Sequence, residues 1–274
     1  MQTDLLLIPF GADYAGLRRA AVAAEESGFD GIWTWDHLQG GGAAGQAPVP
    51  ECWTVLTALA EATSRVTLGP LVLNVANRDP GTLANMAATL QEVSEGRLVL
   101  GIGAGGGIDT PYGAEQQALG RPVPGDAERR ARLIESIRAM RALWSGDGEF
   151  EGRYYQIRNA RGFMQPSSPP PIVVGGFGPK MAALAGEYAD GFNLPAQLPS
   201  LPELAETARE AHSASTNDGP FEISAFTGLQ ESYLRAGSRE RTDLEQRELQ
   251  RLILLTGPPF DVESIREAGR VLVG

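Results

Sequence analysis

Cysteine, histidine and lysine are almost absent from this chain. Its 274 residues include one cysteine, Cys52, two histidines and one lysine, Lys180. A single cysteine cannot form an internal disulfide, and two histidines far apart in the sequence provide no ligand set for a structural zinc ion. We therefore expect no metal site, and we interpret Cys52 as a small packing residue near a helix start.

Basic charge and long apolar runs are also scarce. The 34 acidic residues outnumber the 23 basic ones, which gives a formal net charge of -11, and the arginines form no basic cluster. Nucleic acid is therefore not an expected partner. The chain has no stretch of about 18 apolar residues, and its opening, Met1 to Phe10, carries Asp4 and no cationic leader. These absences predict a cytoplasmic protein that does not enter a membrane.

The chain does contain a regular alternation of short apolar segments and amphipathic segments. Hydrophobic residues make up 42% of it, enough for a large core. Eight strands with intervening helices predict an α/β protein, a (β/α)8 TIM barrel rather than an open doubly wound sheet, in a single domain that covers residues 1–274. The expected strands are 5–10, 31–35, 66–73, 98–102, 172–174, 191–194, 221–226 and 270–273, and the expected helices are 14–27, 51–62, 82–93, 126–144, 181–188 and 203–213.

Three segments depart from the barrel rhythm. Residues 149–165 are aromatic and rich in turn formers, which predicts a hairpin inserted at the mouth of the barrel. The last expected strand, 270–273, leaves no room for a helix after it. The final helix is therefore expected to be short or missing, unless residues 242–269 cover the gap. The glycine-rich stretch 40–45 follows the second strand and is a candidate lid.

Candidate catalytic residues lie where the strands end, because a barrel of this kind builds its site from those ends and the loops beyond them. Asp36 and His37 end the second expected strand. Histidine changes its charge near neutral pH, so beside a carboxylate it suits proton transfer to or from a substrate hydroxyl or carbonyl group. The alternative is that His37 is an ordinary polar residue at a strand end. Asp109, Glu51 and Trp53 are further candidates from their expected place at the mouth.

An anion site is predicted after the fifth strand. The residues Gly175, Gly176 and Gly178 join a strand to a helix start, where free backbone N–H groups and the helix dipole attract a phosphate. Lys180 lies in the first turn of that helix, a place where a cation is unfavourable for the helix itself. A bound anion would explain it. The alternative is that the glycines only let strand and helix pack closely.

The glycine-rich run 101–107 has a poor match to a dinucleotide fingerprint, because it follows the fourth strand and leads into an expected loop at 109–113. We interpret its small residues, Gly103 and Gly105 among them, as keeping the mouth open for a flat ring system that approaches the backbone closely.

Several motifs together resemble the luciferase-like monooxygenase superfamily, in collinear order over residues 4–200. They are GFDGIWTWDHL at 28–38, LGPLV at 68–72, RDP at 78–80, EGRLVLGIGAG at 95–105, GGFGP at 175–179 and ADGFN at 189–193. The Asp36–His37 pair resembles the branch that uses the deazaflavin coenzyme F420. The resemblance implies a TIM barrel with the cofactor lying across the strand ends and its phosphate tail outward.

The resemblance also implies roles for single residues. Asp36 would contact the deazaflavin ring or its ribityl chain, and His37 would be the acid or base for the substrate. A non-prolyl cis peptide at Asn74–Val75 would support the ring from behind. The glycines at 175, 176 and 178 would bind the tail phosphate. The chain departs from the family pattern at Asn74, at Gly106–Gly107 and in its short C-terminus.

The sequence therefore predicts an F420-dependent oxidoreductase that moves a hydride between the deazaflavin and a small organic substrate. Two alternatives stay open. One is an FMN-dependent monooxygenase on the same fold, and the other is a flavin-binding protein without turnover, which the shortened last unit would allow. A homodimer is compatible with the sequence.

Overall fold

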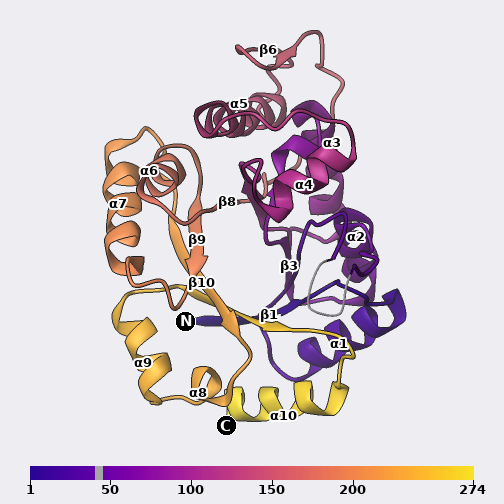
Figure 1. Ribbon diagram of the computed structural model, residues 1–274, viewed down its shortest axis with the longest axis vertical. Coiled ribbons are helices and arrows are strands. Elements are labelled where there is room, and N and C mark those ends of the chain that lie inside the picture. The colour runs from indigo at the N-terminus through magenta and orange to yellow at the C-terminus, as the bar shows by residue number, and fades with distance from the viewer. Residues whose placement is uncertain (41–45) are drawn as a thin grey trace.

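The computed structural model describes residues 1–40 and 46–274, and it shows a ring of parallel strands inside a ring of helices (Figure 1). The candidate lid at 40–45 lies outside the described residues except for Gly40. The strands of the ring are β1 (Gln2–Leu7), β2 (Gly31–Thr34), β3 (Thr67–Pro70), β4 (Leu73–Asn74), β5 (Leu100–Gly103), β8 (Ile172–Gly175), β9 (Gly191–Pro195), β10 (Glu222–Gly228) and β11 (Arg251–Thr256).

The helices cover the outer face of this sheet, as expected for β/α units. They are α1 (Tyr14–Glu26), α2 (Cys52–Ala62), α3 (Pro80–Val93), α4 (Pro111–Ala118), α5 (Asp126–Trp144), α6 (Pro179–Tyr188), α7 (Leu201–Ala214), α8 (Glu231–Leu234), α9 (Arg239–Gln246) and α10 (Val262–Val273), with a short 3₁₀ helix η1 (Val75–Asn77). Cys52 begins α2 and is buried, and burial raises the pKa of its thiol well above the ordinary value, which suits a packing residue.

The sheet order confirms the TIM barrel. It runs β3-β2-β1-β11-β10-β9-β8-β5-β4 with every named pair parallel. β3 and β4 are two parts of the third strand of the barrel, and a bridge between Leu68 and Leu98 joins β3 to the segment before β5. Alternation along the strands points one set of side chains into the barrel, where Leu6, Trp33 and Ile253 pack in one cluster. Gly69 makes room for Trp33, because a Cβ at this position would lie 2.3 Å from the indole ring.

The prediction for the last β/α unit is wrong. Residues 270–273 belong to α10, and the eighth strand is β11, which lies inside the segment 242–269. The final helix is neither short nor missing, because α10 has 12 residues. Its buried residues Ile265, Ala268 and Gly269 follow helical spacing, and Gly269 packs on Ser27 at the end of α1. A three-residue apolar run inside an amphipathic helix was misread as a strand.

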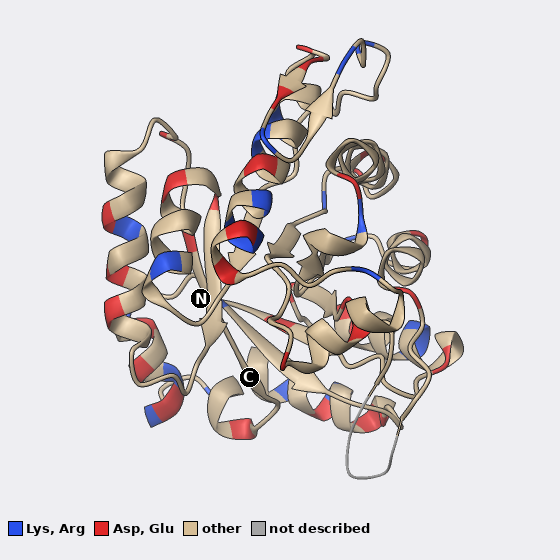
Figure 2. Ribbon diagram, turned by 45° about the horizontal axis from the view of Figure 1, so that its top comes forward, with Lys and Arg blue, Asp and Glu red and all other residues tan. Residues whose placement is uncertain are grey.

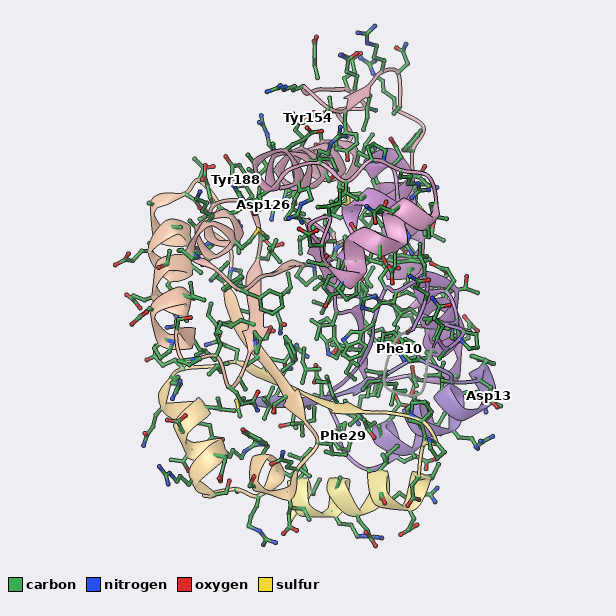
Figure 3. All side chains as sticks on the ribbon, viewed as in Figure 1. Phe10, Asp13, Phe29, Asp126, Tyr154 and Tyr188 are labelled. Carbon is green, nitrogen blue, oxygen red and sulfur yellow. The ribbon has the colours of Figure 1, made fainter. Side chains whose placement is uncertain are left out.

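The inserted hairpin is confirmed, but its expected place is wrong. β6 (Phe150–Glu151) and β7 (Gln156–Ile157) pair antiparallel, and no residue of 149–165 lines the cavity at the strand ends. The hairpin packs on the outer side of α5, where the Glu135 carboxylate accepts hydrogen bonds from the N–H groups of Tyr154 and Tyr155. Tyr154 lies between α5 and the rest of the hairpin, far from Phe10 (Figure 3). The aromatic residues of the insertion therefore cover a helix and not the mouth.

The expected loop at 109–113 is also wrong, because α4 begins at Pro111. Thr110 caps it by accepting a hydrogen bond from the Gly113 N–H, and proline at the first helical position is favourable. This missed helix brings new side chains to the mouth.

Charged residues of both signs alternate along the outer helices, and the ribbon shows no basic face (Figure 2). The prediction that nucleic acid is not a partner stays a prediction. None of the helices in the described parts of the chain has the length and apolar character needed to cross a membrane.

Candidate active site

A cavity of about 770 Å³ opens at the carboxyl ends of the strands, where a TIM barrel places its site. Its walls come from the ends of β2, β4, β5, β8 and β9 and from the starts of α4 and α5. The lining residues include Phe10, Trp35, Asp36, His37, Gln39, Leu71, Val72, Asn74, Gly103, Gly105, Tyr112, Glu115, Asp126, Arg129, Arg130, Gly175, Gly176, Phe177, Asn193 and Phe226.

His37 is held in place by residues of α4. Its Nδ1 lies 2.8 Å from Oε1 of Glu115, whose side chain is 2% exposed. A carboxylate only accepts hydrogen bonds, so Nδ1 carries the proton and Nε2 is the acceptor in the neutral ring. No described residue binds Nε2, and the ring lines the cavity between Tyr112, stacked at 5.1 Å, and Phe10 at 5.2 Å. The arrangement presents a proton acceptor in a fixed orientation.

Asp36 is a structural anchor as well as a cavity residue. Its carboxylate receives two hydrogen bonds from Arg78, at 2.8 and 2.9 Å, and one from the Asn74 N–H at 3.0 Å. Arg78 also contacts Glu51 at 2.5 Å. Burial opposes the charge of Arg78, but the bonds to Asp36 and Glu51 raise its pKa above the ordinary value. The bonds among Asp36, Arg78 and Glu51 therefore connect the end of β2 to the loop after β4 and to the start of α2.

The glycines near the barrel axis leave space that Val72 and Asn74 fill. A Cβ at Gly103 would lie 2.8 Å from Cγ2 of Val72, and one at Gly105 would lie 2.6 Å from Oδ1 of Asn74. Gly105 also has a φ of +72°, which favours glycine. The cis peptide expected at Asn74–Val75 lies instead at Leu71–Val72. Both of those residues line the cavity, whereas Val75 is buried behind it.

The expected anion site has two free amides. Gly176 N–H is occupied by Asn193 O, but in the described structure the N–H groups of Phe177 and Gly178 have no acceptor. Lys180 is exposed and does not line the cavity. The cations that line it are Arg129 and Arg130 of α5, which the sequence analysis missed.

Arg129 and Arg130 differ in how they are held. Arg129 donates to Gly105 O and contacts Asp126 at 2.6 Å, and its buried Nε has no partner. The hydrogen bond and the charge of Arg129 lower the pKa of the Asp126 carboxyl. Arg130 has no ion-pair partner among the described residues. Both arginines lie just after the first turn of α5, whose bounds agree with the predicted helix at 126–144.

The structure brings together most of the residues predicted from the strand ends. Asp36, His37, Asn74, Gly103, Gly105, Gly175 and Gly176 all line the cavity, and Val75, Gly178, Lys180, Asp109 and Glu51 do not. Glu51 caps α2 by accepting from the Thr54 N–H, and Asp109 is exposed in the turn before α4. Catalytic roles for these two residues stay predictions that the geometry does not support. In the described part of the chain, no three acidic, cysteine or histidine side chains gather as a metal site.

The sequence matches the model of the luciferase-like monooxygenase family over residues 5–230. The chain belongs to this family. The fold, the cavity at the strand ends and the predicted resemblance all agree with this membership.

Two curated relatives of this chain are named for the same activity. An F420-dependent glucose-6-phosphate dehydrogenase of Nakamurella multipartita is 42% identical over 175 residues, which is 63% of this chain and 49% of the relative. The protein of the same name from Amycolatopsis mediterranei is 39% identical, over 63% of this chain and 50% of that one. The match thus spans about half the length of these relatives. The match confirms that this chain resembles F420-dependent members of the family.

Solved structures share the fold over nearly the whole chain. An F420-dependent secondary alcohol dehydrogenase in complex with an F420-acetone adduct has a TM-score of 0.84 and 19% identity, and covers 98% of this chain and 97% of its own. An F420-dependent tetrahydromethanopterin reductase from Methanopyrus kandleri has a TM-score of 0.76 and 19% identity, and covers 99% and 98%.

Proposed function

We propose that this family member is an F420-dependent oxidoreductase that transfers a hydride between the deazaflavin and a small organic substrate. The observation that carries the proposal is His37, oriented by Glu115 and facing a cavity whose opposite side is lined by glycines and arginines. The curated relatives with F420-dependent names support the choice of cofactor.

The residues present fit a flat ring with an anionic tail. Gly103 and Gly175 make room for the side chain of Val72, which with Leu71 gives this part of the cavity an apolar surface that a flat ring can contact. The free N–H groups of Phe177 and Gly178 precede the start of α6 and can donate to a phosphate. Arg130 lines the same side of the cavity and supplies a positive charge. When bound, the deazaflavin would accept or donate the hydride.

The protein's own part in the reaction is to place the substrate and move one proton. In the direction of alcohol oxidation, Nε2 of His37 would take the O–H proton of the substrate, and a bound deazaflavin would supply the acceptor for the hydride from the substrate's C–H bond. Glu115 holds the ring so that Nε2 faces the cavity, and it stabilises the charge that the ring gains. Glu115 is therefore a positioning residue and His37 the catalytic one. Trp35, Tyr112 and Phe10 surround the imidazole ring of His37 and keep water away from it.

The cofactor is tested by side-by-side titration of the protein with oxidised F420 and with FMN. We expect micromolar or tighter binding of F420, on the order of 8 kcal/mol, and FMN at least about tenfold weaker. Tighter binding of FMN would reject the assignment. His37→Ala should then lower turnover by about 10²-fold while F420 affinity stays within a few-fold. Unchanged turnover would show that His37 is only a polar residue at a strand end.

The anionic side of the cavity is tested by Arg130→Ala and Lys180→Ala. Arg130 lines the cavity and Lys180 does not, although both lie near Asp126. We expect Arg130→Ala to weaken F420 about tenfold or more, and we expect a smaller loss with Lys180→Ala that shrinks as salt rises. Deazaflavin without its phosphate tail is the control ligand. If the arginine variant bound both ligands with unchanged preference, the tail would lie elsewhere.

A further inference from the structure

The two sides of the cavity differ in charge. Around His37 the wall is aromatic, with Phe10, Trp35 and Tyr112 within ring contact of the imidazole. The other ionisable groups of this wall are the carboxylates of Asp36 and Glu115. We call this wall the histidine end.

The positive groups of the lining belong to the other side. Arg129 and Arg130 lie near the start of α5, where Arg129 binds Gly105 O and Asp126. In Figure 3, Asp126 and Phe10 lie well apart, Asp126 just below α5 and Phe10 at the lower right of the barrel. The cation pattern therefore suits a ligand with one anionic extremity, which lies away from His37.

No cation is available at the histidine end within the described residues. Arg78 does not line the cavity, and its guanidinium is engaged by Asp36 and Glu51. Residues 41–45 are glycine and alanine in the sequence, so they add no charged side chain. A phosphate or carboxylate placed beside His37 would lose hydration and lie near the Glu115 carboxylate, and Arg78, which already pairs with Asp36, would offer it no free charge.

We infer that the substrate of this protein is an uncharged alcohol or carbonyl compound with an apolar or aromatic group, and that a sugar phosphate is excluded from the histidine end. The carbinol oxygen lies at Nε2 of His37, and the apolar group packs among Phe10, Trp35 and Tyr112. Gln39, which also lines this wall, can hydrogen-bond to a neutral polar group. This inference rests on the proposed function. The substrate that it gives this chain differs from the glucose 6-phosphate in the names of the curated relatives.

A matched pair of ligands tests the inference. Benzyl alcohol and 4-(hydroxymethyl)benzoate share the same carbinol and ring and differ by one carboxylate. We expect the neutral compound to bind the protein at least tenfold more tightly, measured by calorimetry or by quenching of tryptophan fluorescence. With F420 present, loss of its absorbance should show kcat/KM about 100-fold higher for the neutral compound, and no turnover of glucose 6-phosphate.

A charge inserted at the histidine end sharpens the test. Gln39→Arg should shift the preference at least tenfold toward 4-(hydroxymethyl)benzoate, whereas the uncharged control Gln39→Met should leave it unchanged. Equal or tighter binding of the benzoate by the parent protein would overturn the inference, and so would failure of both compounds to bind at about 10 mM. Binding to the protein alone is measured without cofactor. A failure to bind F420 would therefore reject the proposed function separately, while the ligand pair still reports on the cavity.

Discussion

Two buried aspartate–arginine pairs lie at opposite ends of the barrel, and they differ in how completely the acid is satisfied. The pair at the amino ends of the strands, which we call the floor pair, joins Asp4 of β1 to Arg251 of β11 at 2.5 Å. Trp33 Nε1 donates to the same oxygen of Asp4 at 2.6 Å, and the second oxygen is buried without a partner. Burial raises the pKa of Asp4, which measures the cost of keeping this acid charged.

The pair at the mouth, Asp36 and Arg78, has no such orphan. Both oxygens of Asp36 are bonded by Arg78, and one also accepts from the Asn74 N–H. Each arginine also binds a second acid: Arg251 contacts Glu222, and Arg78 contacts Glu51. The floor pair is enclosed by the barrel, whereas Asp36 of the mouth pair lines the cavity.

The difference indicates separate tasks. The floor pair cross-links the first and last strands, which are neighbours in the closed barrel, so its loss should act on stability. The mouth pair fixes the chain just before His37 to the loop after β4, so its loss should act on the site as well. Breaking each pair in turn therefore measures how far folding and binding are separated in this molecule.

The largest expected effect is that of Arg251→Met. The substitution leaves Asp4 buried without a cation, and breaking a buried pair from one side costs about 3 to 5 kcal/mol. Unfolding in urea, followed by circular dichroism, measures this loss. The double variant Asp4→Leu with Arg251→Met should recover most of it, because the fully buried carboxylate is removed and the Glu222 carboxylate, which also loses its partner, is partly exposed to water. A single variant that lost less than about 1 kcal/mol would show that the floor pair is not a cross-link.

The second effect is that of Arg78→Met, which we expect to cost about 2 to 3 kcal/mol of unfolding free energy. The loss should be smaller than at the floor, because Asp36 keeps the Asn74 N–H and water can reach the cavity wall. F420 affinity should also fall in this variant and stay unchanged in Arg251→Met. If Arg78→Met cost more stability than Arg251→Met, or if both variants changed F420 affinity equally, the mouth pair and the floor pair would not have separate tasks.

The floor pair also shows what the sequence could not reveal about the fold. Alternating apolar segments were enough to predict the barrel and α5 to its exact bounds, because those patterns are local. The register that brings Asp4 beside Arg251, 247 residues later, is not local. The prediction of the last β/α unit is wrong for a related reason. The buried strand Arg251–Thr256 lies inside the longer, mostly polar segment 242–269, where no strand is predicted.

The candidate site also has residues that the sequence predicts and residues that it does not. Strand ends are visible in the sequence, so Asp36, His37 and the glycines could be placed at the mouth. Glu115 could not, because the prediction has a loop at 109–113 and no helix after it, and a contact with a residue 78 positions away has no sequence signal. Thr110 followed by Pro111 is a helix-start signal that could have revealed α4.

The third effect concerns Glu115 and acts on turnover. Glu115→Leu removes the acceptor for Nδ1–H of His37, so the ring loses its fixed tautomer and orientation, and we expect turnover to fall about tenfold or more. Glu115→Gln keeps an oxygen acceptor and should lose less. The ¹⁵N shifts of the ring report the tautomer directly, and a His212→Gln variant identifies the signal of the only other histidine. If Glu115→Leu left the His37 tautomer and turnover unchanged, Glu115 would be a packing residue.

The smallest effect concerns Glu51, at the outer edge of the mouth pair. Burial of this half-exposed carboxylate opposes its charge, but hydrogen bonds from Thr54 and Arg78 lower its pKa below the ordinary value. A carboxyl group with a lowered folded-state pKa contributes stability above its unfolded pKa and loses it as the pH falls through the folded value. Glu51→Gln should therefore cost about 0.5 kcal/mol at pH 7, and the difference from the parent protein should vanish in acid. Paired urea titrations at several pH values measure it, with Glu206→Gln, on an exposed helix face, as the control. A cost that persisted at low pH would mean that Glu51 acts through packing or its helix cap, and that its charge adds nothing to the mouth pair.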